Sequence, residues 1–216
     1  MIDLHTHTLL SDGDLLPSEL ARRAEEKGYK FIGITDHVDF STFEVTVESI
    51  VRASGCMNKN RTGIQVIPGV EITHVNPAQI KQLVKNCRDC GARLVVVHGE
   101  TIVEPVLKGT NRKALEADID ILAHPGIMEE QDAKLAAERK ISVEISGRAG
   151  HSFSNGHVVR LWYKYGFPLV LDTDTHSPED LVDDAFAEKL IISAGVKAKD
   201  VKEVLENSLH LARKLL

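Results

Sequence analysis

The chain begins with a short strand-like run that ends in two histidines, Met1-Ile2-Asp3-Leu4-His5-Thr6-His7. Alternate residues of a strand share a face, so both imidazoles point to the same side. A doubly wound open sheet usually carries a glycine-rich phosphate turn (GxGxxG) after its first strand, and none follows Leu4. The opening therefore favours a barrel over an open sheet, with chemistry at the end of the first strand.

The rest of the chain repeats this strand, turn and helix pattern, which is typical of a parallel α/β sheet. The predicted strands are residues 1–5, 31–35, 64–70, 94–97, 121–123, 142–145 and 168–171. The predicted helices are residues 17–27, 42–54, 77–90, 104–117, 129–140, 157–165, 179–194 and 198–216, the last with an expected break near Asn207. We expect residues 1–216 to form one α/β domain, a distorted (β/α)7 TIM-like barrel.

Composition agrees with one globular domain, since 43% of the 216 residues are hydrophobic and 27% are charged. The net charge of −6 makes a stable nucleic-acid partner unlikely, although bound cations can still attract anionic substrates. The longest apolar runs, such as 94–97, are far too short for a membrane span, and no secretory leader is recognisable. We therefore expect a cytoplasmic protein without a membrane partner, in an oligomeric state that the sequence leaves open.

The three cysteines do not form a disulfide framework, because their number is odd and their spacing is uneven. Cys87 and Cys90 form a CxxC within a predicted helix, with no second pair to complete a zinc site. Buried thiols are the better interpretation.

Metal-binding residue types follow the carboxyl ends of the predicted strands, where α/β barrels build their active sites. In chain order they are His5, His7, Asp12, Asp36, His37, Glu71, His74, His98, Glu100, His124, His151, Asp172, Asp174 and His176, and Arg148 also follows a strand end. A single histidine at a strand end is more often a loop donor than a ligand, but five of the seven ends carry one. Imidazole and carboxylate together suit zinc, manganese or iron, and a carboxylate can bridge two ions.

Some of these residues have simpler interpretations. Asp12 precedes Gly13 and can stabilise a turn there instead of binding a metal, and Asp172 can take part in strand-end hydrogen bonding. His157 can cap a helix or lie near a substrate, while His210 is expected at the surface.

With these motifs, nearly the whole chain resembles the polymerase and histidinol phosphatase (PHP) family. The matching motifs are Asp3-Leu4-His5-Thr6-His7, Ser11-Asp12-Gly13, Thr35-Asp36-His37, Pro68-Gly69-Val70-Glu71, His98, Ala123-His124-Pro125 and Thr173-Asp174-Thr175-His176-Ser177. The resemblance implies a distorted seven-stranded barrel with two or three divalent ions (Zn, Mn or Fe).

The resemblance also implies how the ligands divide among the ions. The first ion would take His5, His7, Glu71 and Asp174; the second Asp12, His37 and His176; and the third His98 and His124, with Glu71 as the bridge. Some relatives have histidine where this chain has Asp12, a common substitution in the family that could alter the metal preference.

The implied activity is hydrolysis of a small phosphomonoester, as in histidinol-phosphate phosphatases, by a metal-bridging hydroxide. Asp12 and Asp174 would be catalytic as ligands, and Arg148 is the candidate phosphate clamp, unless it is a surface arginine. His151 or His74 would protonate the leaving oxygen, and His157 is a further candidate substrate contact. The segment 144–157 resembles a poorly characterised prokaryotic branch of the family, so the family name does not identify the substrate.

Three other functions compete with this hypothesis. A nuclease or nucleoside-bisphosphate phosphatase would use the same metals, but aromatic content of 5% and the lack of a basic arm favour small substrates. Amidohydrolases also begin with HxH, yet they usually place a bridging lysine at the fourth strand end, where this chain has His98. A non-catalytic ribonuclease P-type scaffold would have lost metal ligands and gained a basic face.

Overall fold

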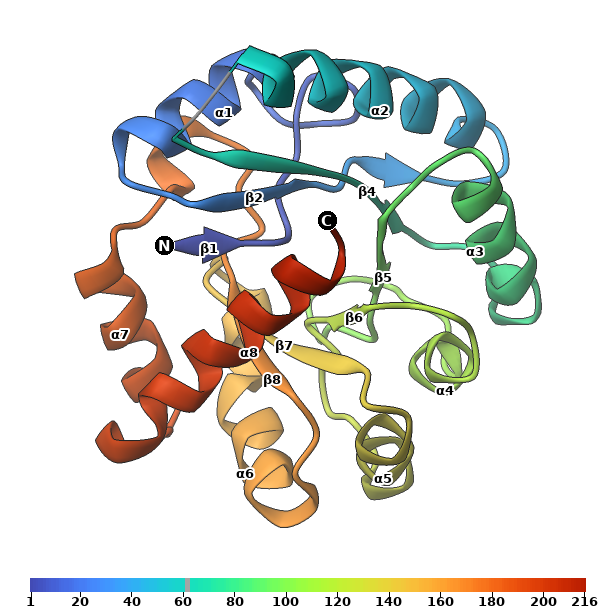
Figure 1. The fold of residues 1–216 in the computed structure, drawn as a ribbon. Helices are drawn as coiled ribbons and strands as arrows, with labels where there is room; N and C mark the ends of the chain where they lie inside the picture. Colours follow the sequence, from blue (N-terminus) through green and yellow to red (C-terminus); the bar gives the residue numbers. More distant parts are fainter. Residues whose placement is uncertain (61–62) are drawn as a thin grey trace.

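The chain forms a parallel sheet that curls into a nearly closed barrel with helices around it (Figure 1). This computed structural model describes residues 1–60 and 63–216. Along the barrel the strands are β1 (Ile2–Asp3), β2 (Phe31–Ile34), β4 (Gln65–Ile72), β5 (Leu94–His98), β6 (Ile121–Ala123), β7 (Ser142–Ser146) and β8 (Leu169–Asp172). The predicted seven-stranded α/β barrel is confirmed. The two-residue strand β3 (His37–Val38), which pairs with β4, was too short for the sequence pattern to indicate.

The helices lie around the outside of the barrel, except for the last one, which crosses one of its ends. They are α1 (Pro17–Glu26), α2 (Phe43–Asn60), α3 (Ile80–Asp89), α4 (Thr110–Leu115), α5 (Glu130–Arg139), α6 (Asn155–Tyr165), α7 (Asp184–Ser193) and α8 (Val201–Lys214). Short 3-10 turns cover Pro77–Gln79, His151–Ser154, Pro178–Asp180 and Ala198–Asp200. Among the described residues, no helix is both long enough and apolar enough to cross a bilayer.

Four helix predictions were wrong in their bounds or continuity. Helix α2 continues past the expected end at Ser54 to Asn60, and α7 begins at Asp184 instead of Glu179. The other two have an identifiable cause. The helix expected from Glu104 begins only at Thr110, because the side chain of Glu100 accepts hydrogen bonds from the backbone N–H groups of Gly109 and Asn111 and holds the chain there in a turn. The expected break near Asn207 is absent from α8; the Asn207 amide instead donates to the carbonyl of Leu169 on β8. Both errors come from side chains whose partners are invisible to local patterning.

The barrel closes between β1 and β8 through side chains, since the described residues show no strand ladder between these two. The Asp172 carboxylate accepts the backbone N–H of Leu4 at 2.6 Å, and Thr173 Oγ1 donates to Asp3 Oδ2 at 2.5 Å. Beyond the strands, Thr6 forms an isolated parallel bridge with Thr175. This seam places the loop after β8 beside the loop after β1.

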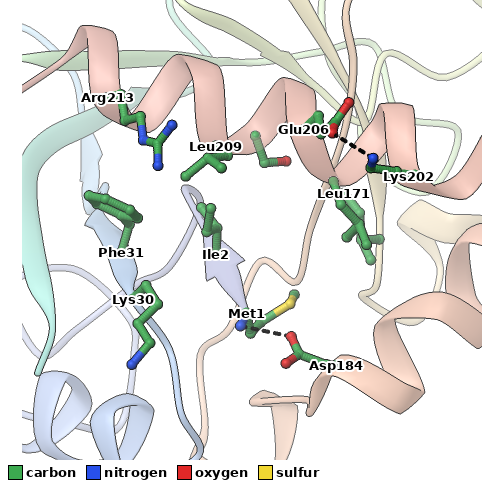
Figure 2. Close-up of a pocket in the computed structure, with 12 residues that line it drawn as sticks. Met1, Ile2, Lys30, Phe31, Leu171, Asp184, Lys202, Glu206, Leu209 and Arg213 are labelled. Atoms are coloured by element: carbon green, nitrogen blue, oxygen red, sulfur yellow. Dashed lines mark ion pairs between the residues drawn. The ribbon is translucent and has the colours of Figure 1, made fainter.

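Helix α8 crosses the amino-terminal opening of the barrel (Figure 1). Its Leu211 and Ala212 pack with the interior side chains, which are Leu4, Ile67, Leu94, Val96, Ile121, Ala123 and Val170. Figure 2 shows the same helix over Ile2 and Phe31, with an ion pair between the Met1 ammonium and the Asp184 carboxylate beside it. These two groups lie 2.7 Å apart. A cavity of about 430 Å³ remains here, and its lining holds neither histidine nor cysteine. The chemistry predicted from the sequence must therefore lie at the other end.

Candidate metal centre

All nine predicted metal ligands meet at the carboxyl ends of the strands. His5 and His7 follow β1, Glu71 lies in β4, His98 ends β5, and the others lie in β3 or in loops that follow strands. A cavity of about 350 Å³ opens over them, and its walls include six of the nine: Asp12, His37, His98, His124, Asp174 and His176. His5, His7 and Glu71 lie beneath it, fully or almost fully buried.

The first cluster, here called the His5 group, contains His5, His7, Glu71 and Asp174. His5 Nε2 lies 3.4 Å from Glu71 Oε2 and 3.8 Å from Asp174 Oδ1. His7 Nε2 lies 3.6 Å and 3.2 Å from the same two carboxylates. Four side chains from three strand ends thus converge within about 4 Å of one another.

The second cluster, the His37 group, contains His7, Asp12, His37 and His176, whose ligand atoms lie within 4.8 Å of one another. Asp12 Oδ1 is 3.2 Å from His176 Nε2 and 3.5 Å from His37 Nε2. Asp12 is therefore placed among imidazoles as well as in a turn. Its carboxylate is the exposed member of the group.

The third cluster, the His98 group, contains His98, His124 and His151, again with ligand atoms within 4.8 Å. Glu71 Oε1 lies 3.4 Å from His124 Nε2, and Glu71 Oε2 lies 2.8 Å from His37 Nδ1. The Glu71 carboxylate therefore faces members of all three groups. His151, predicted as a substrate contact, lies among the imidazoles of this group.

The buried donor atoms fit metal ions better than they fit one another. His5 Nε2, both nitrogens of His7 and both oxygens of Glu71 have no hydrogen-bond partner, whereas buried polar groups normally have one. With metal–ligand bonds of about 2.0–2.1 Å, the ligand atoms of a tetrahedral site are roughly 3.3 Å apart. Most of the separations above lie close to that value. The buried His and Glu clusters are consistent with a site for several metal ions.

Neighbouring groups orient the imidazoles. His5 Nδ1 lies 2.7 Å from Glu144 Oε2, and His98 Nδ1 lies 3.1 Å from the carbonyl of Gly99, so the Nε2 atoms of both rings face the centre. Such second contacts fix the ring orientation and raise the basicity of a metal-bound histidine. Sequence analysis missed Glu144, although a carboxylate inside the apolar run of β7 was the available indication.

Backbone strain concentrates at the same place. Among the described non-glycine residues only His74, His124, Lys140 and Asp174 have positive φ, and three of these four belong to the cavity. Such conformations persist only where the surrounding structure enforces them, and they cluster at functional sites.

Burial and charge act in opposite directions on the pKa values. Burial lowers the pKa of His5, but Glu71, Glu144 and Asp174 outweigh it and hold that pKa well above its usual range. For His7 burial prevails and lowers the pKa to about 3. Burial raises the pKa of Asp174, but the surrounding imidazoles more than compensate and bring it below its usual range. The raised pKa of His5 means that the buried carboxylates favour a positive charge at this point, which a bound metal ion would also supply.

The other predicted site residues divide into two sets. Arg148, His74 and His151 line the cavity; Arg148 Nη1 donates to the Asp174 carbonyl at 3.2 Å and lies 2.7 Å from His176 Nδ1. The structure does not bring His157 there; its Nε2 donates to the Met128 carbonyl at 2.8 Å.

Glu104 is a cavity residue that the sequence did not indicate, since it was expected within a helix. The contact with His98 lowers the pKa of Glu104 more than burial raises it, so that pKa falls to about 2. Asp36 has a structural part, because it accepts hydrogen bonds from Thr8 and Ser11 and so holds the loop that carries Asp12.

Comparison with known proteins agrees with this geometry. The chain is 45% identical over 215 residues to the uncharacterized protein MJ1295 of Methanocaldococcus jannaschii, which covers 99% of this chain and 97% of that protein. The solved structure of archaeal ribonuclease P with mature tRNA contains a chain with a TM-score of 0.74 at 16% identity, covering 100% of this chain and 91% of that one. Histidinol phosphate phosphatase from Lactococcus lactis, solved with zinc, L-histidinol and phosphate, gives a TM-score of 0.59 at 18% identity and covers 91% of this chain and 94% of that one.

These two structural likenesses concern the fold. The family model for the PHP domain, however, matches residues 3–166, which is most of the chain and includes seven of the nine predicted ligands. With that match and the shared barrel, the chain belongs to the PHP domain family.

Proposed function

We propose that the protein is a multi-metal phosphoesterase that hydrolyses a small phosphomonoester. The observation that supports this most directly is the sharing of Glu71 by three clusters of metal-binding side chains beneath one small cavity. A volume of about 350 Å³ suits a phosphoryl group with a compact organic part.

The proposed ligands are His5, His7, Glu71 and Asp174 for one ion, Asp12, His37 and His176 for a second, and His98, His124 and Glu71 for a third. The mixed nitrogen and oxygen donors suit zinc, manganese or iron. When bound, such ions lower the pKa of a water molecule and neutralise phosphoryl oxygens.

Around this centre, the chain's own groups would bind and orient the substrate. Arg148 enters the cavity from the loop after β7 and is its one guanidinium, suited to gripping phosphoryl oxygens in pairs. His74 and His151 lie next to Glu104 in the same cavity, and either could donate a proton to a leaving oxygen.

A substrate panel tests this proposal. The purified protein, loaded with Mn²⁺ or Zn²⁺, would be assayed against sugar phosphates, amino-alcohol phosphates, nucleotides and short oligonucleotides. Glu71→Gln should remove bound metal and at least about a thousandfold of the rate together, because it withdraws the shared carboxylate. The matched control is Glu138→Gln, an exposed carboxylate on α5. Full turnover by metal-depleted Glu71→Gln protein would refute the proposal.

A second candidate is hydrolysis of nucleotides or of an RNA end on the same centre. Two phenylalanines on loops after strands at this end of the barrel are exposed: Phe153, at 74%, and Phe40, at 42%. Exposed aromatic rings beside a phosphate site can stack on bases. Higher kcat/KM on oligonucleotides than on every monoester in the panel would favour this candidate.

The fold likeness to a chain of archaeal ribonuclease P raises a third candidate, a scaffold without catalysis. The full set of metal-binding side chains argues against it. Elemental analysis would decide, since a scaffold predicts less than one bound metal ion per chain.

A further inference from the structure

The loop between β5 and α4 carries a carboxylate into the candidate metal centre. Glu104 Oε2 lies 3.2 Å from His98 Nε2 and 3.2 Å from His74 Nε2, while Oε1 lies 3.4 Å from His151 Nε2. Both oxygens therefore face imidazoles, two of which belong to the His98 group. These separations match those between ligands that share a metal ion.

The two ends of this loop are held firmly. Glu100 Oε1 accepts the N–H groups of Gly109 and Asn111, and the Asn111 side chain in turn accepts the N–H of Glu100 at 2.9 Å. Thr101 Oγ1 lies 2.8 Å from His151 Nδ1. The loop thus presents Glu104 from a fixed base.

The side chains at the tip of the loop are exposed. Ile102, Val103 and Leu107 are each about half exposed, at 53%, 47% and 56%, and the Glu104 side chain itself is 37% exposed. A carboxylate on such a tip can leave its position without disturbing the barrel core.

The number of ligands around the third ion explains why Glu104 would have to be displaced before substrate binds. The proposed ligands of the third ion are His98, His124 and Glu71, since His151 is assigned to proton transfer, and Glu104 would be the fourth ligand that completes a tetrahedral shell. Catalytic sites keep one coordination position for water or substrate. Glu104 also brings a negative charge to a cavity whose lining otherwise offers one guanidinium, that of Arg148, to an incoming phosphate.

We propose that Glu104 is a displaceable ligand of the His98 group, which closes that part of the centre at rest and yields its position to a phosphoryl oxygen. This inference rests on the proposed function for the identity of the incoming group. The ligand assignment itself rests only on the contacts of Glu104.

The test uses the full-length chain loaded with Mn²⁺, in the variants Glu104→Gln and Glu104→Ala. Metal retained after graded chelation would be measured by elemental analysis, and the affinity for inorganic phosphate by titration calorimetry. The matched control is Glu129→Gln, a carboxylate in the loop before α5 that lies 3.8 Å from Lys108 Nζ on the exposed surface. Circular dichroism should show an unchanged fold for all three variants, since the altered side chains are in loops.

We expect both Glu104 variants to lose one metal equivalent at about tenfold lower chelator concentration and to bind phosphate about tenfold more tightly, while Glu129→Gln behaves as wild type. Unchanged metal retention would overturn the ligand assignment. Weaker retention without tighter phosphate binding would overturn displacement. Neither readout requires turnover, so a chain that hydrolyses no phosphate ester but shows the metal effect would refute the proposed function and leave the ligand assignment standing.

Discussion

Arg148 is already held within the centre before any substrate arrives. Its Nη1 donates to the Asp174 carbonyl and lies 2.7 Å from His176 Nδ1, so the guanidinium is oriented by two residues of the loop after β8. An orientation fixed in advance reduces the entropy lost when phosphate binds.

Arg148→Lys should therefore lower kcat/KM by about 10- to 100-fold, mainly through KM, because lysine keeps the charge but cannot make paired hydrogen bonds. Steady-state kinetics with the best substrate of the panel would measure this, and metal content should stay at the wild-type level. Arg160→Lys, an exposed arginine on α6, is the control. Unchanged kinetics in Arg148→Lys would exclude Arg148 as a phosphate contact.

At the level of elements, the weakest join in the barrel is the seam between β1 and β8. Buried side chains replace a strand ladder there, with Asp3 and Asp172 as the acceptors. Burial raises the pKa of Asp3 to about 6, with hydrogen bonds from Thr173 and His5 acting against it. The stability of the seam thus depends on the hydrogen bonds that the Asp3 and Asp172 carboxylates accept.

Thr173→Val should lower the free energy of unfolding by about 1–3 kcal/mol, because it leaves Asp3 Oδ2 buried without its hydroxyl donor. Urea denaturation would measure the change. Ser193→Ala removes an exposed hydroxyl that bonds the Leu190 carbonyl, and it should cost less than about 0.5 kcal/mol. Equal losses in the free energy of unfolding for the two substitutions would contradict the proposed role of the Thr173 hydroxyl in the seam.

Helix α8 covers the amino-terminal end of the barrel. Leu211→Ala should cost about 2–5 kcal/mol by opening a cavity in the barrel interior. Leu216→Ala, at a position that is 53% exposed, should be nearly neutral. Since α8 lies at the opposite end from the metal-binding side chains, denaturant midpoints should shift while metal content per folded chain does not. Loss of metal in folded Leu211→Ala protein would show that the two ends are coupled.

At the scale of the whole molecule, the two ends of the barrel differ in polarity. The interior and the α8 end are apolar, while the other end concentrates buried imidazoles and carboxylates whose atoms lack partners. Buried unpaired polar groups weaken a fold until a ligand satisfies them.

Removal of metal should therefore lower Tm by roughly 5–10 °C for each ion lost, since an ion at a hundredfold excess over its Kd adds about 2.7 kcal/mol. Calorimetry before and after chelation would measure the shift, and restored Mn²⁺ or Zn²⁺ should reverse it. Far-ultraviolet circular dichroism should stay the same, because the apolar core does not depend on the ions. An identical Tm in both states would argue against metal binding by these groups.

The predictable part of this protein is the part written in local patterns. Alternation of β-branched runs with helical segments was enough to place all seven barrel strands, because strand and helix periods depend on neighbours in the chain. The ligand types at strand ends were equally visible, since parallel strands bring their carboxyl ends to one edge. His5 and His7 illustrate this, two residues apart on one face.

Contacts between distant segments were decided only by the tertiary structure. The sequence pattern predicted a helix at Glu104, but the Glu100 side chain holds a loop there and Glu104 contacts His98. In the sequence Glu144 is a single charge within a strand, and only the folded sheet brings it next to His5. His157, equally plausible in sequence, turned away to Met128. The sequence by itself determined the barrel and the kinds of side chain at its carboxyl end. Which of them meet, and that Glu71 faces all three clusters, depended on distances that only the closed sheet defines.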